Sequence, residues 1–159
     1  MSVVPPPPPP SVASEPPLWA PYYGASLGTA FVRFWKKYAT FSGRASRSEY
    51  WWLALISAVL GIILEIVLVS TTAGTVVVSD AGVPSFGPAY YAVITITWII
   101  SLGTLVPTLA VVWRRLHDTN RSGGYYFIAL IPLVGGIILI VFLASAPVPA
   151  GVRFDRPTS

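Results

Sequence analysis

The sequence contains no cysteine and only one histidine, His117. The absence of cysteine excludes disulfides, thiol catalysis, thiolate metal sites and lipid attachment through cysteine. A metal site at His117 and Asp118 would need further ligands, because most catalytic metals require three or four. We therefore expect no metal site and no cofactor.

Catalytic signatures are also lacking. A catalytic pair of His117 and Asp118 would have no identifiable nucleophile other than Ser122. The pair Gly123-Gly124 follows no strand and does not have the spacing of a phosphate-binding loop. We therefore predict that the protein is not an enzyme and has no catalytic residue.

Charged residues are scarce, at 10% of the 159 residues, whereas hydrophobic residues make up 54%. Soluble domains have about a quarter of their residues charged, and one soluble core of this size would hardly hold so much apolar surface. Five of the ten Lys and Arg lie between Arg33 and Arg47, and three lie between Arg114 and Arg121. Basic clusters beside apolar runs fit anionic lipid headgroups better than nucleic acid. We expect membrane lipid as a partner and no nucleic acid.

Three apolar runs, at residues 50–72, 90–113 and 124–146, contain enough residues to cross a hydrocarbon core of about 30 Å. The first run begins with Tyr50-Trp51-Trp52, where an aromatic belt belongs. Pro107 removes the amide that would bond to a carbonyl one turn earlier in the second run, so we expect a kink there. The pattern predicts an all-α membrane protein with three transmembrane helices.

The third run is interrupted by Pro132, Gly135 and Gly136. A kinked span is the simpler interpretation, because 23 residues are too few to cross the bilayer twice. The alternative is a re-entrant segment that returns to the same side. The excess of Lys and Arg before the first run and between the second and third predicts a cytoplasmic amino terminus. A third span would then place Arg153 and Arg156 outside, a conflict that re-entry would remove.

The amino terminus is rich in proline, with an unbroken run at Pro5–Pro10. This composition is typical of an extended, disordered tail, which we assign to residues 1–28. Residues 29–39 follow with Phe31, Phe34, Trp35 and Tyr38 at helical spacing and basic residues beside them. This pattern predicts an amphipathic helix in the membrane interface. A second tail is expected at residues 147–159, after a membrane domain at 29–146.

Glu65 is the one charged residue within the three apolar runs. A carboxylate at bilayer depth is costly, so it indicates a function or a polar partner. The structural interpretations are protonation of Glu65, a hydrogen bond to Thr95, Thr97 or Ser101, or a tilt of the span that shifts Glu65 towards the outer interface. A proton or ion pathway is the alternative, which would make the protein a small transporter or channel subunit that uses Glu65 and the kinked spans.

Two polar motifs border the apolar runs. Ser46-Arg47-Ser48-Glu49 has the spacing of a capping box, in which Ser46 and Glu49 bond to each other's amides at a helix start. The candidate residues for lipid or partner contact in the two motifs are Arg44, Arg47, Glu49, Arg114, Arg115, His117, Asp118 and Arg121. Because charges at a headgroup boundary are costly unless paired, we predict that Glu49 approaches Arg114 or Arg115 and that Asp118 faces Arg44 or Arg47. The alternative is local: Glu49 only caps its helix, and Asp118 pairs with Arg114.

The two motifs, residues Phe41–Trp52 and Arg114–Gly123, resemble the signatures of the domain-of-unknown-function 805 family. Ile131–Gly135 is similar to the Ile-Pro-x-x-Gly element that follows in that family. The chain differs at Gly124, where the family usually has tryptophan, and at Val152–Asp155, where Asn-Arg-Phe-Gly is common. The resemblance implies a small, multi-pass protein of the bacterial inner membrane, and it implies no established activity.

Together these patterns predict a non-enzymatic membrane component whose basic cytoplasmic face contacts lipid headgroups or a protein partner. A second copy of the chain is a further expected partner.

Overall fold

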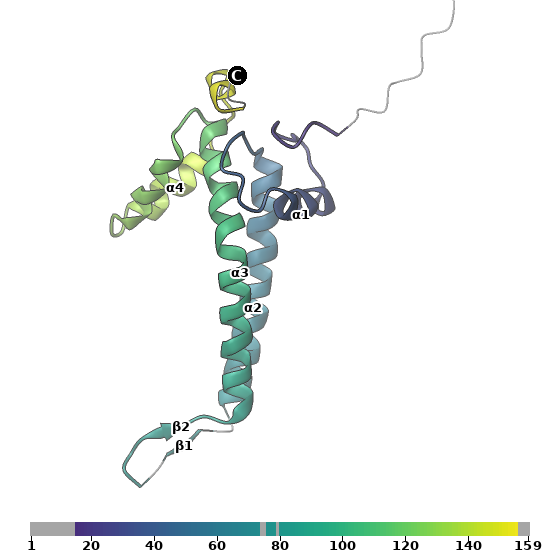
Figure 1. Ribbon diagram of the computed structural model, residues 1–159. Coiled ribbons are helices and arrows are strands. Elements are labelled where there is room, and N and C mark those ends of the chain that lie inside the picture. The colour runs from purple at the N-terminus through teal and green to yellow at the C-terminus, as the bar shows by residue number, and fades with distance from the viewer. Residues whose placement is uncertain (1–14, 74–75, 79, 156–159) are drawn as a thin grey trace, which may run out of the picture.

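A computed structural model of the protein describes residues 15–73, 76–78 and 80–155. In these residues the chain is mostly helical, and its termini lie near the same end of a long helix pair (Figure 1). The elements in chain order are α1 (Leu27–Lys36), α2 (Arg47–Thr72), β1 (Val77–Val78), β2 (Pro84–Ser85), α3 (Pro88–Asp118), the 3₁₀ helix η1 (Gly123–Leu130), α4 (Gly135–Ala144) and the 3₁₀ helix η2 (Pro149–Phe154).

Helices α2 and α3 form an antiparallel pair that the small β1–β2 hairpin joins at its far end (Figure 1). With 26 and 31 residues, they extend over about 39 and 46 Å at about 1.5 Å per residue. Their middle sections expose large apolar side chains on most sides, such as Ile66 at 62% and Leu102 at 61%. Two helices of the described residues are thus long and apolar enough to cross a membrane, and the exposed side chains suit contact with lipid.

The third apolar run does not form the kinked span that we took as the simpler interpretation. It divides into η1, with 8 residues, and α4, with 10 residues, and each is shorter than the roughly 20 residues that a transmembrane helix needs. The turn between them contains Leu133, which has a positive φ of 66° and is 94% exposed. After the turn the chain comes back to the end of α3, where the carbonyls of Leu143 and Ser145 accept hydrogen bonds from Arg115. The structure therefore has a hairpin whose two ends lie at the same end of the helix pair.

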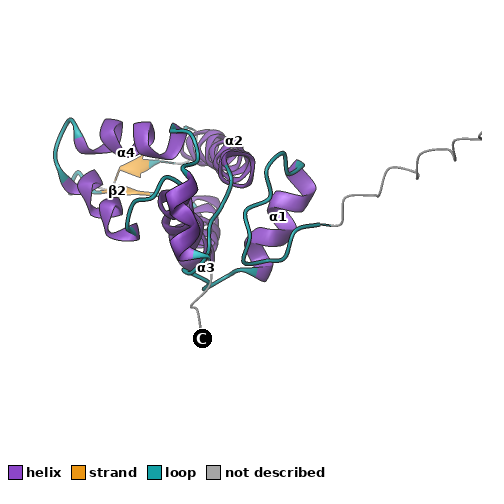
Figure 2. Cartoon of the chain, turned by 90° about the horizontal axis from the view of Figure 1, so that it is seen from above, coloured by secondary structure: helices purple, strands orange, loops and turns teal. Residues whose placement is uncertain are grey.

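Seen from above, α1 lies on one side of the α2–α3 pair and the η1–α4 hairpin on the other (Figure 2). Two small apolar cores lie at this end of the molecule. One contains Phe34, Leu53 and Val111, which join α1, α2 and α3. The other contains Leu116 and Leu139 among its members and joins α3 to α4. The packed part of the fold is thus the end that carries the polar motifs.

Two basic residues of the α1 segment, Arg33 and Lys37, are buried in the protein, whereas the predicted interfacial helix had them beside its aromatic face. Ala30, Arg33, Phe34 and Lys37 point inward at helical spacing, whereas Phe31, Trp35 and Tyr38 stay more than a third exposed. The exposed aromatic side chains lie next to the apolar part of the helix pair. The Tyr38 hydroxyl donates a hydrogen bond of 2.8 Å to the Gly103 carbonyl. Pro107 has no amide to bond to this carbonyl, so Tyr38 satisfies it while α3 continues through Pro107.

The described part of the amino-terminal tail is ordered against the helices, which differs from the predicted disorder of residues 1–28. We call residues 16–25 the strap. The Tyr22 amide donates to Glu49, the Ala25 amide donates to Ser48, and the Ala25 carbonyl accepts from Trp52. These contacts depend on residues far along the chain, so local composition did not reveal them. The proline run Pro5–Pro10 lies outside the described residues.

The carboxyl-terminal tail also packs on the helix pair. The Val148 amide donates to the Asp118 carbonyl, and the Gly43 amide donates to the Phe154 carbonyl. A Cβ atom at Gly151 would lie 2.6 Å from the His117 carbonyl oxygen, so only glycine allows this close approach. Residues 148–155 are therefore part of the folded unit. Arg156 lies outside the described residues.

Candidate functional site

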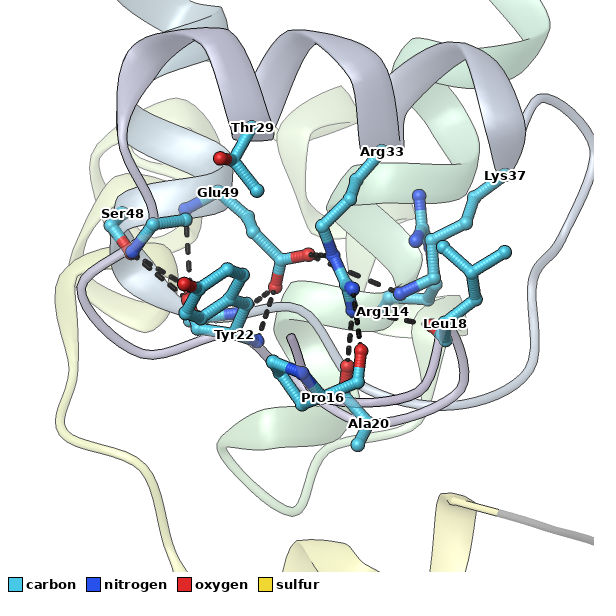
Figure 3. Close-up of polar contacts among 12 residues, drawn as sticks. Pro16, Leu18, Ala20, Tyr22, Thr29, Arg33, Lys37, Ser48, Glu49 and Arg114 are labelled. Atoms are coloured by element: carbon cyan, nitrogen blue, oxygen red, sulfur yellow. Dashed lines mark hydrogen bonds and ion pairs between the residues drawn. The ribbon is translucent and has the colours of Figure 1, made fainter. Parts of the chain in front are cut away.

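A cluster of charged side chains lies inside the protein where α1, α2 and α3 meet. Glu49 is at its centre, with a side chain only 3% exposed (Figure 3). Its carboxylate accepts from Arg33 Nε at 2.6 Å, from the Ser46 amide at 2.9 Å and from the Tyr22 amide at 3.0 Å. The Ser46 hydroxyl accepts from the Glu49 amide in return. The predicted capping box is confirmed, and the same carboxylate also binds α1 and the strap.

Arg33 connects the strap to this centre. Besides its bond to Glu49, the guanidinium donates to the carbonyls of Pro16, Pro17, Leu18 and Ala20, the last at 2.6 Å (Figure 3). Four carbonyl dipoles and one carboxylate thus surround a cation that is 3% exposed. Buried charges of this kind are tolerated when their donors are satisfied, and Arg33 meets that condition.

Lys37 and Arg114 are less well satisfied. Lys37 Nζ lies 4.0 Å from Glu49 Oε1, beyond hydrogen-bond distance. Among the described residues, Lys37 Nζ and Arg114 Nη2 are buried with no hydrogen-bond partner. Burial and the nearby Arg114 lower the pKa of Lys37 to about 7, although Glu49 opposes the change. Three cations therefore share one carboxylate, and this half of the cluster has surplus positive charge.

The second half of the cluster centres on Asp118, which is fully buried. Its carboxylate pairs with Arg115 one turn back, and Arg44 Nη1 lies at 3.5 Å. The Tyr23 hydroxyl of the strap donates to it at 2.8 Å. Partial burial and this hydrogen bond raise the pKa of Tyr23 to about 12. Asp118 thus joins α3 to both the first motif and the strap.

Arg44 extends the cluster to the carboxyl-terminal tail. Its guanidinium binds Asp155 through two parallel hydrogen bonds of 2.6 Å each, the geometry in which arginine holds a carboxylate most firmly. The bond to Asp155 raises the pKa of Arg44. His117 stacks on Phe154 with ring centroids 4.0 Å apart, and its Nδ1 lies 3.0 Å from the Gly43 carbonyl. The histidine is therefore a packing residue that holds the tail.

The structure brings the two sequence motifs together, but with different pairs from some of those predicted. Asp118 faces Arg44, as one of the two predicted pairs required. Glu49 forms its hydrogen-bonded ion pair with Arg33 of α1, which was not among the predicted partners. Arg114 lies near enough to share the charge of Glu49 without bonding to it. The local partner of Asp118 is Arg115, three residues back, and not Arg114.

Most of the eight candidate contact residues are inside the protein. Glu49, Arg114, Arg115, His117 and Asp118 are buried, and the Arg44 side chain is 12% exposed. Arg47 is exposed and Arg121 is half-buried, with its guanidinium over the Phe142 ring. Only these two remain accessible to a lipid headgroup or a partner. Of the six others, Arg44, Glu49, Arg115 and Asp118 form internal ion pairs, since buried charge has to be paired.

The sequence interpretation missed four members of the cluster. Arg33 and Lys37 had been assigned to the polar border of α1, and Tyr23 and Asp155 to disordered tails. A signal was available for Arg33 and Lys37, because they share a helical face with Ala30 and Phe34. Tyr23 and Asp155 carry no local signal, since their partners are 95 and 111 residues away.

Glu65 lies apart from this cluster, on an exposed stretch of α2. It makes no hydrogen bond or ion pair with any described residue. The hydroxyls of Thr95 and Thr97, which we considered as partners, donate to carbonyls of their own helix. A metal is not an evident partner either: no group of three or more His, Asp or Glu side chains suited to a metal occurs in the described residues.

Comparison with known proteins now assigns the chain to a family. Residues 38–156 match the family model described as a protein of unknown function, DUF805. The chain belongs to the DUF805 family. It is 32% identical over 121 residues to the inner membrane protein YhaI of Escherichia coli K12, which covers 76% of this chain and 87% of YhaI. It is also 32% identical over 124 residues to the inner membrane protein YhaH of the same strain, which covers 78% and 91%. No solved structure matches significantly.

The DUF805 match confirms the resemblance that the two motifs indicated. It begins at Tyr38 and so excludes the strap and α1, whereas it includes both motifs and Asp155. The relatives are inner membrane proteins by name, in agreement with the apolar helix pair. The family therefore supports a membrane protein of unknown activity, to which the geometry of the cluster adds detail.

Proposed function

We propose that this DUF805 protein is a non-enzymatic component of the bacterial inner membrane whose cytoplasmic end contacts anionic lipid headgroups. The observation that carries this proposal is the distribution of basic residues. In the described residues, every Lys and Arg lies at the end of the helix pair that holds the charged cluster. Four of them, Lys36, Arg47, Arg121 and Arg153, have accessible side chains.

The other end of the helix pair supports the same orientation. Its connecting segment contains a single charged residue, Asp80, between the ends of α2 and α3. Basic residues concentrate on the cytoplasmic side of inner membrane proteins. We therefore place the amino terminus, the cluster and the carboxyl-terminal tail in the cytoplasm, with the β1–β2 hairpin outside.

We propose two spans, α2 and α3, and a re-entrant hairpin formed by η1 and α4. The hairpin starts and ends beside the charged cluster, so Arg153 stays on the cytoplasmic side. The conflict that a third span creates for Arg153 and Arg156 is then removed. The exposed tip at Leu133 and Val134 is apolar and suits insertion into lipid.

The exposed side chains of α1 support a position of this helix in the membrane interface. Phe31 and Trp35 are exposed beside the apolar stretch of the helix pair, and Lys36 is exposed on the same short helix. Aromatic and basic side chains combine in this way in helices that lie in the interface plane. Arg47 and Trp51 at the start of α2 are exposed at the same end of the molecule.

The non-enzymatic part of the proposal is supported by how the buried cluster is used. Glu49, Asp118 and Asp155 each bind at least one arginine. A general acid or base has to reach its substrate within hydrogen-bond distance. These carboxylates instead tie α1, the strap and the tail to α2 and α3, which is a structural role.

The test is lipid retention by the full chain purified in mild detergent, with bound phosphatidylglycerol and phosphatidylethanolamine measured by mass spectrometry. The triple variant Lys36→Gln, Arg47→Gln, Arg153→Gln removes three accessible charges. Each basic residue near an anionic surface contributes about 1 kcal/mol, so retention of phosphatidylglycerol should fall at least about threefold after screening by salt.

The matched control is the variant Lys36→Arg, Arg47→Lys, Arg153→Lys, which keeps all three charges and should retain lipid as the wild type does. Equal phosphatidylglycerol retention by the wild type and the neutral variant contradicts the proposal. A protein that co-purifies with the wild type and is lost with the neutral variant assigns this face to a protein partner.

A further inference from the structure

A groove of about 640 Å³ lies between α2 and α3 on their lipid-facing side. Phe31, Phe34 and Trp35 of α1 close it at the cytoplasmic end. Its walls are mainly aliphatic, and Gly61 of α2 widens it, since a Cβ atom there would meet no other atom within 4 Å. The groove is partly open, as a site filled from the bilayer has to be.

Among the residues that the structure describes, Glu65 is the one charged side chain that lines the groove. It is exposed and has no described partner. Neither helix offers a cation in this region, because residues 48–113 contain no Lys or Arg. A carboxylate in lipid is stable only with a proton or an opposite charge beside it. A ligand that brings a cation into the groove would therefore complement it.

The position of Glu65 along α2 defines the shape of such a ligand. The aromatic side chains of α1 pack near Leu53 and Ile56, which precede Glu65 by 12 and 9 residues. At about 1.5 Å per residue, the apolar length between them is roughly 14 to 18 Å. Glu65 itself lies only about 10 Å from the end of α2 at Thr72. Glu65 thus lies near the outer end of the groove, and a long apolar section extends from it toward α1.

We propose that the groove binds a single-chain cationic amphiphile, with its ammonium group at Glu65 and its alkyl chain along Gly61 toward the aromatic side chains of α1. This orientation is the one such a molecule has in the outer leaflet, with the head outward and the chain toward the bilayer centre. Charge complementarity favours this occupant over a neutral acyl chain, which would bring no opposite charge to the carboxylate. The site is separate from the headgroup contacts proposed above.

The experiment uses the full chain in phosphatidylcholine nanodiscs, with radiolabelled dodecylamine as the probe and dodecanol as the uncharged probe of equal length. Uptake by empty discs is subtracted. The wild type should take up dodecylamine saturably, and Glu65→Gln should weaken this binding at least about tenfold, the effect of one charge-assisted hydrogen bond. Asp80→Asn removes the same charge from the outer hairpin and should bind as the wild type does.

A second pair of variants tests the groove without altering charge. Gly61→Leu fills the space beside Glu65 and should abolish saturable dodecylamine uptake. Gly136→Leu is its control, because Gly136 also has open space around it but lies in α4, away from the groove, and it should have no effect.

Three results would overturn the proposal. The first is equal dodecylamine binding by the wild type and Glu65→Gln. The second is saturable dodecanol uptake equal to that of dodecylamine, which would assign the groove to neutral chains. The third is cross-linking between Gly61→Cys chains, equally efficient with and without dodecylamine, which would place a second copy in the groove. The natural chain has no cysteine, so this cross-link reports on position 61 alone.

Discussion

The Lys37 side chain is 2% exposed. Its ammonium group lies beside Arg33 and Arg114 and 4.0 Å from the single carboxylate that they share, Glu49. Replacing Lys37 with methionine removes the charge and keeps an unbranched apolar chain of similar length. Because Arg33 still pairs with Glu49 at 2.6 Å, the carboxylate is not left alone. We expect Lys37→Met to stabilise the protein at neutral and lower pH.

The magnitude follows from the pKa of Lys37, which falls from 10.5 to about 7 in the folded protein. Since each pH unit corresponds to about 1.4 kcal/mol, the penalty on the charged side chain is at most roughly 5 kcal/mol. Loss of the attraction to Glu49 and relaxation of the site reduce the gain, so an increase in unfolding free energy of about 1 to 3 kcal/mol is expected.

The direction with pH follows from proton binding. Between about pH 7 and 10.5, Lys37 is protonated in the unfolded chain and neutral in the folded protein. The unfolded state thus binds more protons in this range, and stability must rise with pH. The penalty is complete below about pH 7 and disappears above pH 10.5. Lys37→Met should remove this dependence of stability on pH. Its gain in stability over the wild type should be largest at the low end of this pH range.

The assay is thermal unfolding in mild detergent, followed by tryptophan fluorescence at pH 6.5 and pH 9. Lys36→Met is the matched control, because Lys36 is the exposed neighbour of Lys37 and its loss should change the midpoint little. The wild type should melt at a higher temperature at pH 9, while Lys37→Met should melt at similar temperatures at both. A lower midpoint for Lys37→Met than for the wild type at pH 6.5 would refute the reasoning.

Two further predictions concern the tail and the topology. Arg44→Lys should make the carboxyl-terminal tail more sensitive to protease, because lysine cannot form the two parallel bonds of 2.6 Å to Asp155 and the pair should lose about 1 to 3 kcal/mol. Lys36→Arg, at an exposed position, is the control, and equal protection in both variants would contradict the role of Asp155. A reporter fused after Gly82 should be external, and reporters after Asn120 and Phe154 should both be cytoplasmic. Opposite locations for the reporters after Asn120 and Phe154 would support a third span.

Much of the fold could be predicted from local patterns. The run from Tyr50 to Thr72 has the length of a span, and α2 covers it completely. Ser46 and Glu49 have the spacing of a capping box, and both hydrogen bonds form. Gly43, just before α2, has a positive φ of 80°, a conformation that glycine adopts without strain. Each of these features depends on residues within one or two turns, which is the range over which sequence patterns are informative.

The third apolar run shows where such patterns fail. The run is long and apolar enough for a span, and the interruptions at Pro132 and Gly135 fit either a kink or a turn. The deciding interactions are the bonds from Arg115 to the carbonyls of Leu143 and Ser145. They join positions about 30 residues apart, and no pattern within the run itself contains them.

The candidate site was only partly predictable for a related reason. Opposite charges in the two motifs indicated pairing, and Arg44 does face Asp118. The partner of Glu49 was wrong because Arg33 belongs to a helix whose aromatic spacing suggested an outward polar border. Burial of the Arg33 face depends on the carbonyls of the strap, which the proline-rich composition gave no reason to expect.

The charge balance of the cluster connects these observations. Within the residues that match the family model, 38–156, the cluster has three arginines, Arg44, Arg114 and Arg115, and three carboxylates, Glu49, Asp118 and Asp155. This part is neutral. Arg33 and Lys37 precede the match and add two positive charges. The strap, which also precedes the match, surrounds the Arg33 guanidinium with carbonyl oxygens. It provides no hydrogen-bond partner for Lys37. The surplus charge is therefore a property of the amino-terminal segment, and removing it at Lys37 should leave the neutral arrangement of the matched region intact.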